Sequence, residues 1–405
     1  MMPEQSITPQ LRRVLSLPWL VFYGVGVTVG AGIFALIGDI LGLAGDHAPW
    51  SFAVAGVVAG FTALSFAALS SAYPRAAGEV IYVKEGIGHL AGRLVGYALL
   101  VTALMAGAVI SLAFAGYVAS FSGLPEWAAL IGMLVLLAGV AAAGVKESVA
   151  VAALITALEV GTLLIVIAVG LPSAIGSGAL WTVLSPPTEL PQWSAVLAGS
   201  FLAFFAFIGF ENIVNMAEEA EDATRVIPKA VLLTLVISVA IYALAAAVAA
   251  SFEDRAALVA SKAPLAVLFE GATGQPGAII AAMASIAMVN GILVQIVMAS
   301  RVLYGMAGEG MMPGLLGRLH PRRQTPVIAI ALFTLLIGVL ALTVPLVRLA
   351  EMTSFVILAI FTMVNVSLFL IGGRASAPPR LRRWRWTGLI GAVISLGLIA
   401  SELVP

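Results

Sequence analysis

Residues 24–34 read GVGVTVGAGIF, and residues 204–212, in the second half of the chain, read FFAFIGFEN. Each stretch interrupts a long apolar segment with residues that a helix interior disfavours. The first stretch holds four glycines, and each glycine costs a helix about 1 kcal/mol relative to alanine. In the second stretch, Gly209 is followed closely by Glu211 and Asn212. The pattern predicts two helices that break partway along their length. Close helix packing through Gly26 and Gly30 is the alternative explanation of the first stretch.

The composition of the chain indicates that these breaks lie in a membrane and not in a soluble domain. Of the 405 residues, 61% are hydrophobic and only 10% are charged, and the mean hydropathy is +1.11. A soluble domain has about 25% charged residues, because its surface must face water. The apolar residues suffice for about eleven helices of the ~20 residues that a bilayer requires. We therefore expect an all-α polytopic membrane protein, in which irregular backbone is tolerated only where it lines protein or water.

Eleven spans are predicted from the apolar segments. Their ranges are 16–44, 50–72, 92–121, 126–145, 149–172, 193–216, 229–251, 276–305, 326–344, 349–372 and 386–403. If the N-terminus lies in the cytoplasm and the spans alternate, 17 of the 20 Lys and Arg residues fall on the cytoplasmic side. Only Arg255, Lys262 and Arg348 fall outside. This bias follows the positive-inside rule and predicts a multi-pass protein of the cytoplasmic membrane with its C-terminus outside.

Acidic residues inside the spans are the first candidates for a site, because a carboxylate at membrane depth is costly. Three of the 20 acids lie more than two residues inside the predicted spans: Asp39, Glu159 and Glu211. Asp39 lies near the outer end of the first span, where its carboxylate can reach water. Glu159 and Glu211 lie mid-span, and we expect a function for both.

The two predicted breaks also relate the two halves of the chain. Interrupted hydrophobic segments, one in each half, indicate a transporter built from inverted repeats that binds its ligand near the bilayer midplane. We expect one transmembrane domain over residues 1–405, with a first repeat at 16–172, a second at 193–372 and a peripheral helix at 386–403.

Several motifs, in chain order, resemble the amino acid–polyamine–organocation superfamily, whose members have the five-plus-five-helix leucine-transporter fold. The motifs are GAGIF (30–34), YPRAAGEVIYV (73–83), GVKES (144–148), FFAFIGFEN (204–212), AEEAEDATRVIPKA (217–230), SRVLYGMAGEGMMP (300–313) and TSFVILAIFTMVNVSL (353–368). The resemblance covers nearly the whole chain and extends to the cationic and neutral amino acid members. It implies a secondary active transporter that works by alternating access and needs no cofactor.

By this resemblance, backbone groups of the broken helices hold the substrate. The residues are Thr28, Gly30, Ala31, Gly32, Phe205 and Ile208. The three amides of residues 30–32 would bind the substrate carboxylate, since they lie at the positive end of a half-helix. Carbonyls of the other three residues would accept hydrogen bonds from the substrate ammonium. The apolar or small residues nearby favour a neutral amino acid.

Three side chains near the second break have expected roles. Glu211 matches a position that is usually acidic in the superfamily, where the carboxylate can bind backbone amides of the broken helix or carry a coupled proton. Phe205 and Phe207 are candidates for a gate that closes over the ligand. An aromatic core role is the alternative for both phenylalanines.

Glu159 departs from the pattern of the superfamily. Many relatives have a lysine at this position, and its ammonium takes the place of a sodium ion. A carboxylate cannot take the place of a cation as the lysine ammonium does; instead it can bind a cation or carry a proton. We expect Glu159 to be the coupling residue, with Asn290 as its partner on the facing helix and with a proton favoured over sodium. A structural carboxyl paired to a polar neighbour is the alternative.

Other classes of function fit the sequence less well. The three histidines lie in or near loops, so the spans hold no set of residues that would serve an intramembrane enzyme. The sequence also has no repeated filter motif that would indicate a channel. A sensor with a transporter-like core stays open. A net charge of zero gives no field for nucleic acid, whereas the basic stretch RLRRWRW (380–386) suits anionic lipid headgroups. Within transport, exchange and polyamine or amine substrates stay open.

Overall fold

The computed structural model describes residues 15–75, 78–144, 149–308 and 312–403. Within these ranges the chain is helical, and the only β pairing is an isolated bridge between Leu15 and Ala220. The prediction of an all-α protein is therefore confirmed. Arg12, Arg13 and most of the GVKES motif lie outside the described residues.

The described helices follow one another along the whole chain, with short 3-10 segments labelled η. They are α1 (Leu17–Thr28), α2 (Ala31–Ala44), η1 (Gly45–His47), α3 (Ala48–Ala72), α4 (Gly78–Gly86), α5 (His89–Ser122), α6 (Glu126–Ala143), α7 (Val149–Gly176), α8 (Ala179–Leu184), α9 (Leu190–Ala203), η2 (Phe204–Phe207), η3 (Phe210–Met216), α10 (Ala223–Ala250), α11 (Arg255–Ala260), α12 (Pro264–Thr273), α13 (Ala278–Gly308), η4 (Gly314–Gly317), α14 (Val327–Thr343), α15 (Leu346–Gly372) and α16 (Pro379–Leu403).

Nine helical stretches in the described ranges are long and apolar enough to cross a membrane. One of them, Ala31–Ala72, contains both α2 and α3, which the turn at Gly45 separates. α14 has 17 residues and is one residue shorter than the shortest of these stretches, α6. The eleven predicted spans thus correspond to α1 with α2, α3, α5, α6, α7, α9 with η2 and η3, α10, α13, α14, α15 and α16.

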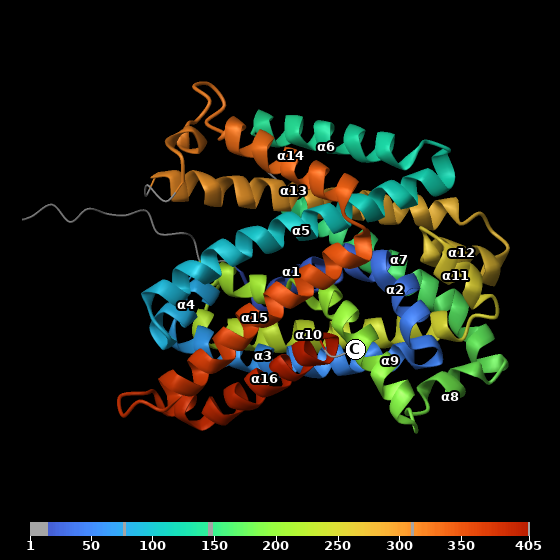
Figure 1. Ribbon diagram of the computed structural model, residues 1–405, viewed down its shortest axis with the longest axis horizontal. Coiled ribbons are helices and arrows are strands. Elements are labelled where there is room, and N and C mark those ends of the chain that lie inside the picture. The colour runs from blue at the N-terminus through green and yellow to red at the C-terminus, as the bar shows by residue number, and fades with distance from the viewer. Residues whose placement is uncertain (1–14, 76–77, 145–148, 309–311, 404–405) are drawn as a thin grey trace, which may run out of the picture.

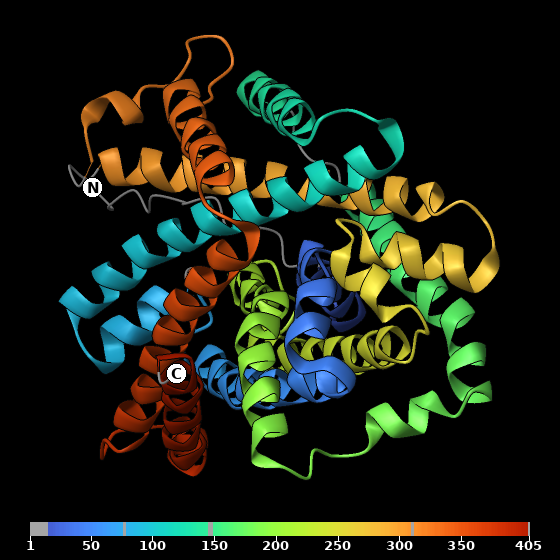
Figure 2. The same cartoon turned by 45° about the vertical axis from the view of Figure 1, so that its right-hand side comes forward.

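The first broken helix lies at the centre of the bundle. Figure 1 and Figure 2 show α1 and α2 between one group of helices that includes α5 and α13 and another that includes α3, α9 and α10. α1 packs directly against α7 and α10, and α2 packs against α9. Residues 24–34 are therefore surrounded by protein, the setting in which irregular backbone is tolerated at membrane depth.

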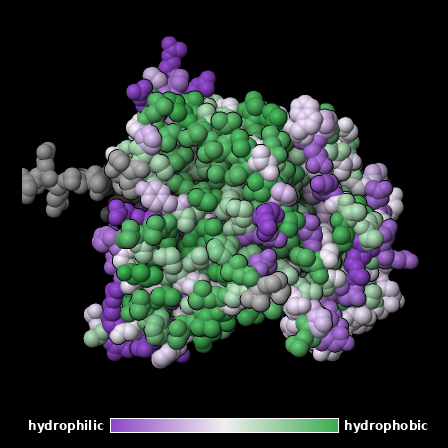
Figure 3. Space-filling model, in the orientation of Figure 1, coloured by the Kyte–Doolittle hydropathy of each residue, from purple (hydrophilic) through white to green (hydrophobic). Residues whose placement is uncertain are grey.

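The outward surface of the bundle suits lipid. Large apolar side chains are strongly exposed on its outer helices, among them Val135 and Leu136 of α6 and Leu335 and Val339 of α14. Figure 3 shows apolar residues across the middle of the molecule and hydrophilic residues gathered towards its left and right ends. This distribution, together with the nine apolar stretches, makes the chain a multi-pass membrane protein.

Basic residues of α4 and of the starts of α5, α10 and α16 gather at one end of the bundle (Figure 1), which we call the basic end; they include Lys84, Arg93, Arg225 and Arg380. The starts of α1, α5, α10 and α16 meet there with α4, at the left of Figure 1. Two contacts tie it together. The Arg374 guanidinium donates a hydrogen bond to the Glu85 carbonyl at 2.7 Å. The Leu15 amide donates to the Glu219 carbonyl at 3.0 Å, which joins the start of α1 to the segment after η3.

Candidate functional site

The first break separates α1 from α2 by two residues. The Val29 amide still bonds to the Val25 carbonyl at 2.7 Å, and Gly30, with φ −51° and ψ −163°, then turns the chain away from the helix. No side chain caps the start of α2 at Ala31. Its first-turn amides therefore lack intrahelical partners and present the positive end of a helix dipole.

The second break is longer. After α9 the chain forms the 3-10 helix η2, passes through an extended Ile208 and reverses at Gly209, where φ is +136°. The 3-10 helix η3 then continues to Met216. The Gly209 amide donates a hydrogen bond to Oε2 of Glu211 at 2.8 Å, and Glu211 is only 4% exposed. The break is thus capped by a carboxylate of its own segment.

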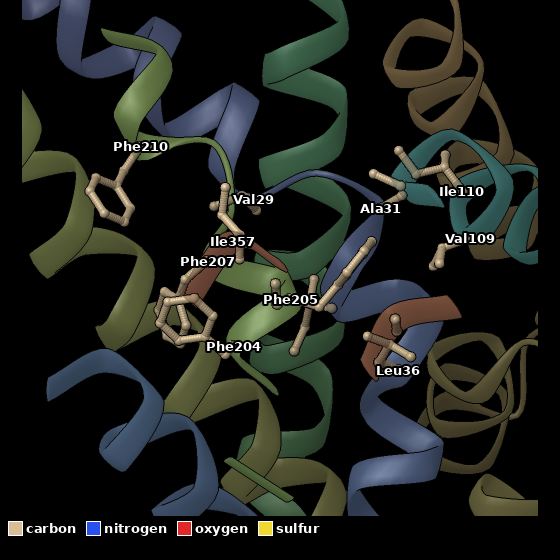
Figure 4. Close-up of a cluster of buried hydrophobic side chains, with 14 of the residues drawn as sticks. Val29, Ala31, Leu36, Val109, Ile110, Phe204, Phe205, Phe207, Phe210 and Ile357 are labelled. Atoms are coloured by element: carbon tan, nitrogen blue, oxygen red, sulfur yellow. The ribbon is translucent and has the colours of Figure 1, made fainter. Parts of the chain in front are cut away.

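The two breaks lie directly against each other. A Cβ atom built on Gly209 would lie 2.7 Å from the Val27 carbonyl oxygen, and one built on Gly32 would lie 2.7 Å from the Ala206 Cα. Real Cβ contacts are essentially never this short. Figure 4 shows the interruption at Val29 beside the aromatic residues of η2. Glycine is needed at both positions because backbone meets backbone there.

Tyr242 of α10 joins the two breaks. Its hydroxyl oxygen lies 2.5 Å from the Thr28 carbonyl oxygen and 2.9 Å from that of Ala206. The side chain is fully buried, and its ring packs on Phe207 at 5.1 Å between centroids. The Tyr242 hydroxyl has one proton and can donate to only one of these carbonyls at a time, although both lie within hydrogen-bond distance of its oxygen.

The sequence prediction missed Tyr242, although a signal for it exists. Thr234, Ser238 and Tyr242 recur every four residues along an otherwise apolar helix and therefore share one face. All three are fully buried. Thr234 donates to the Val21 carbonyl at 3.5 Å, so this face of α10 lies against α1. A polar stripe at helical spacing would have identified α10 as the helix that contacts the first break.

Glu159 lies beside the first break. It is 5% exposed, and its Oε1 is 3.9 Å from the position that a Cβ on Gly30 would occupy. One turn earlier, Thr156 packs closely on Gly26 of α1. No described residue makes a hydrogen bond or ion pair with the Glu159 carboxyl, which lies within electrostatic range of the Tyr242 hydroxyl. The structure thus places an acid at the turn that separates α1 from α2.

The remaining predicted residues have mixed surroundings. Asn290 lies half-buried on α13, which packs against α7, but among the described residues no hydrogen bond joins it to Glu159. The Phe205 carbonyl accepts a hydrogen bond from the Ile208 amide at 3.2 Å. The buried Thr28 hydroxyl makes no hydrogen bond within the part of the chain that the structure describes. Thr28, Phe205 and Ile208 therefore lie at the breaks as predicted, whereas the predicted pairing of Asn290 with Glu159 is absent among the described residues.

Two cavities of the described chain lie away from the breaks. One of about 380 Å³ is lined by the ends of α7 and α10 and by α12, and includes Glu253 and Asp254. Another of about 100 Å³ lies between α3, α10 and α16. Neither is lined by residues 24–34 or 204–212. At the breaks themselves, the backbones of α1, α2 and η2 pack closely at Gly32 and Gly209.

Comparison with known proteins agrees with this architecture. The model of the amino acid permease family matches residues 14–405. An uncharacterized transporter of Mycobacterium tuberculosis is 30% identical over 398 residues, which cover 96% of this chain and 87% of the relative.

Two relatives with more specific names are more distant. The branched-chain amino acid permease BcaP of Bacillus subtilis is 26% identical over 91% of this chain and 83% of its own length. Cationic amino acid transporter 4 of Mus musculus is 26% identical over 93% of this chain and 62% of its own length. The helices, the adjoining breaks and these matches agree, and the chain belongs to the amino acid permease family of the amino acid–polyamine–organocation superfamily of membrane transporters.

Proposed function

We propose that this protein imports a neutral amino acid together with a proton, by alternating access, with its basic end in the cytoplasm. The observation that carries the proposal is the buried Glu159 carboxyl, which lies beside the Gly30 turn and has no hydrogen-bond or ion-pair partner among the described residues. A carboxyl in that position can exchange a proton while the substrate occupies the adjoining backbone groups. The family membership and the names of the relatives support an amino acid as the substrate.

The substrate would use backbone groups that recognise every amino acid. The uncapped first-turn amides of α2 at residues 30–32 suit the carboxylate, because anions bind well at helix N-termini. The ammonium would meet the carbonyls of Thr28 and Ala206, which the Tyr242 hydroxyl occupies in this structure. Tyr242 then holds the empty site together and gives up its hydrogen bonds when the ammonium arrives.

The side chains around the breaks favour a neutral substrate. Figure 4 shows Leu36, Val109, Ile110 and Ile357 around the two interruptions, and none of them can pair with a charged group. Glu211 is already hydrogen-bonded to a backbone amide. An apolar wall stabilises an apolar side chain by about 25 cal/mol per Å² of surface removed from water.

Transport in proteoliposomes tests the role of Glu159. In Glu159→Gln we expect counterflow, which needs no proton, to persist, whereas accumulation driven by an inward proton gradient is lost. The measurement is uptake of labelled neutral amino acids across a range of external pH. Glu126→Gln, which changes an exposed acid at the start of α6, is the matched control. Driven accumulation with unchanged pH dependence in Glu159→Gln would refute the proposal.

One observation favours a second candidate. Because the Glu159 carboxyl has no partner among the described residues, it can also pair with a second amino group of the substrate. A diamine, a polyamine or a cationic amino acid would then be carried, by exchange or by uptake. In counterflow assays this alternative predicts that Glu159→Gln loses transport of such cations, whereas the proton role predicts that the variant still exchanges neutral amino acids.

A further inference from the structure

A third buried acid, in addition to Glu159 and Glu211, lies outside the membrane-spanning helices. Glu79, in the first turn of α4, is only 3% exposed, although the sequence places it in a loop. Its neighbour Gly78 packs so closely on η3 that a Cβ there would lie 2.7 Å from Cγ2 of Val214. Glu211 lies one turn before Val214, and the Glu79 and Glu211 carboxyls act on each other electrostatically. Two buried acids therefore share the contact between α4 and the second break.

The surroundings of this pair are apolar. Tyr82, one turn after Glu79, is fully buried, and its hydroxyl has no hydrogen-bond partner among the described residues. Its ring packs on Phe66 of α3, which in turn packs on Phe210 of η3 at 6.0 Å. These rings keep water away from the two carboxyls.

No cation balances the pair among the described residues. α4 packs against α3, α5 and α15. α3 has no titratable side chain, and the charged residues of α15, Arg348 and Glu351, lie at its other end. The other charged side chains described on or beside α4 are exposed: Arg75, Lys84, Glu85, His89, Arg93 and Arg374, whose guanidinium donates to the Glu85 carbonyl. Tyr97, half-buried on α5, is uncharged at neutral pH. Among the described residues, the titratable groups that interact with the Glu79 carboxyl are therefore Glu211 and Tyr82.

Two neighbouring buried carboxyls cannot both be ionised at low cost. Burial, and then the charge of Glu211, raise the pKa of Glu79 to about 8. The Glu211 carboxylate accepts a hydrogen bond from the Gly209 amide, an arrangement that suits its charged form. Glu79 is therefore the member of the pair that holds the proton at neutral pH.

We propose that Glu79 is a proton-binding site, separate from Glu159, whose proton locks α4 onto the second break and so keeps the basic end closed. When this end opens, water reaches Glu79, the carboxyl releases its proton to that water, and the resulting carboxylate is repelled by Glu211. The proposal rests on the proposed transport function, in which the basic end opens to the cytoplasm.

The sign of the pH effect follows from the closed state. Glu79 binds its proton more tightly when buried than when hydrated, so the closed form takes up the proton and low pH favours it. As pH rises from the ordinary carboxyl value towards 8, closing is progressively lost. The ratio of closed to open protein then changes by up to about tenfold per pH unit.

Distances between spin labels test this in the full-length protein. The chain has no cysteine, so Ile87→Cys after α4 and Glu221→Cys after η3, both exposed, can be labelled alone. Pulsed electron resonance at pH 6 and pH 9 would report the population of the short distance. We expect it to decrease at pH 9 in the labelled parent and in Glu85→Gln, an exposed control on α4, but to stay constant in Glu79→Gln.

Three outcomes would overturn the proposal. The first is a pH-independent distance in the parent protein. The second is the same pH response in Glu79→Gln as in the parent. The third concerns Glu211→Gln, which keeps Glu79 and serves if Glu79→Gln does not fold. Removing the like charge should move the pH-dependent change in distance to lower pH. A change at the same pH as in the parent would show that Glu211 does not affect the protonation of Glu79.

The same samples separate this inference from the proposed function. In Glu159→Gln the pH-dependent distance should remain even though proton-driven uptake is lost. A distance that follows Glu79 in a protein with no proton-driven uptake would leave the Glu79 site standing and refute the proton-coupled transport.

Discussion

The two broken helices, one in each half of the chain, differ in how they treat the backbone amides that a break exposes. The first breaks over two residues, Val29 and Gly30, has no positive φ, and leaves the amides that follow without a side-chain cap. The second breaks over most of residues 204–216, turns at a positive φ on Gly209, and caps its own amide with Glu211. The first break presents free donors, whereas the second satisfies its donor internally.

This difference separates binding from positioning. Free amides at a helix start are available to an anionic ligand. A capped turn under steric constraint instead fixes the path of the backbone. We infer that the first break recognises the substrate and that the second holds its carbonyls in place and transmits movement to η3 and α4. Substitutions at the two breaks should therefore have different effects on folding and on binding.

The largest effect is expected at the tightest glycine. In Gly209→Ala, a side chain at φ +136° costs roughly 1–3 kcal/mol of backbone strain, and it also meets the Val27 carbonyl. We expect a marked loss of thermal stability and no transport. In Gly30→Ala, where φ is negative and the nearest atom lies 3.4 Å away, the protein should fold normally and bind substrate less tightly.

Melting temperature and substrate binding of the purified variants would check this contrast. Gly132→Ala is the control, because its added methyl meets no atom within 4 Å. Equal loss of stability at Gly30 and Gly209 would contradict the assignment of different roles to the two breaks.

A smaller effect is expected from removing the cap. Glu211→Ala leaves the buried Gly209 amide without a partner, which costs about 1–3 kcal/mol. Glu211→Gln keeps an acceptor and should recover most of this loss. Unfolding in mixed detergent micelles would measure both variants against Glu126→Ala at an exposed site. If Glu211→Ala is as stable as Glu211→Gln, the hydrogen bond does not hold the break.

The smallest effect concerns the link between the breaks. Tyr242→Phe keeps the ring contacts with Phe52 and Phe207 but removes a hydrogen bond worth about 1 kcal/mol. Without substrate the variant should melt at a lower temperature than the parent. Saturating amino acid should then raise its melting temperature by more than it raises that of the parent, because no hydroxyl competes for the carbonyls. An identical rise in both proteins would show that Tyr242 and the ammonium do not share these acceptors.

Much of the architecture was predictable from local sequence. The low charge indicates a membrane protein, and glycine clusters in apolar segments mark where the helices break, because both signals arise from residues close together in the chain. The family resemblance on motifs such as GAGIF at residues 30–34 and FFAFIGFEN at 204–212 is confirmed by the match to the amino acid permease family. The two repeats over residues 16–172 and 193–372 and the substrate contacts stay predictions.

The sequence was less informative where distant segments meet. Tyr242 bonds to the Thr28 carbonyl across 214 positions of the chain, and only the polar stripe on α10 hints at this contact. Glu79 has the sequence context of a loop acid, and it becomes buried only because α4 packs onto η3. Such burial depends on tertiary packing, which composition and spacing do not encode.

The central claim is that the free amides of the first break bind the substrate carboxylate. The most direct measurement is the melting temperature of the purified protein with each of a series of amino acids and with the corresponding amines, which have the same side chain and ammonium but no carboxylate. We predict that at least one neutral amino acid raises the melting temperature and that its amine does not. Stabilisation by amines alone, with none from any amino acid, would contradict the claim.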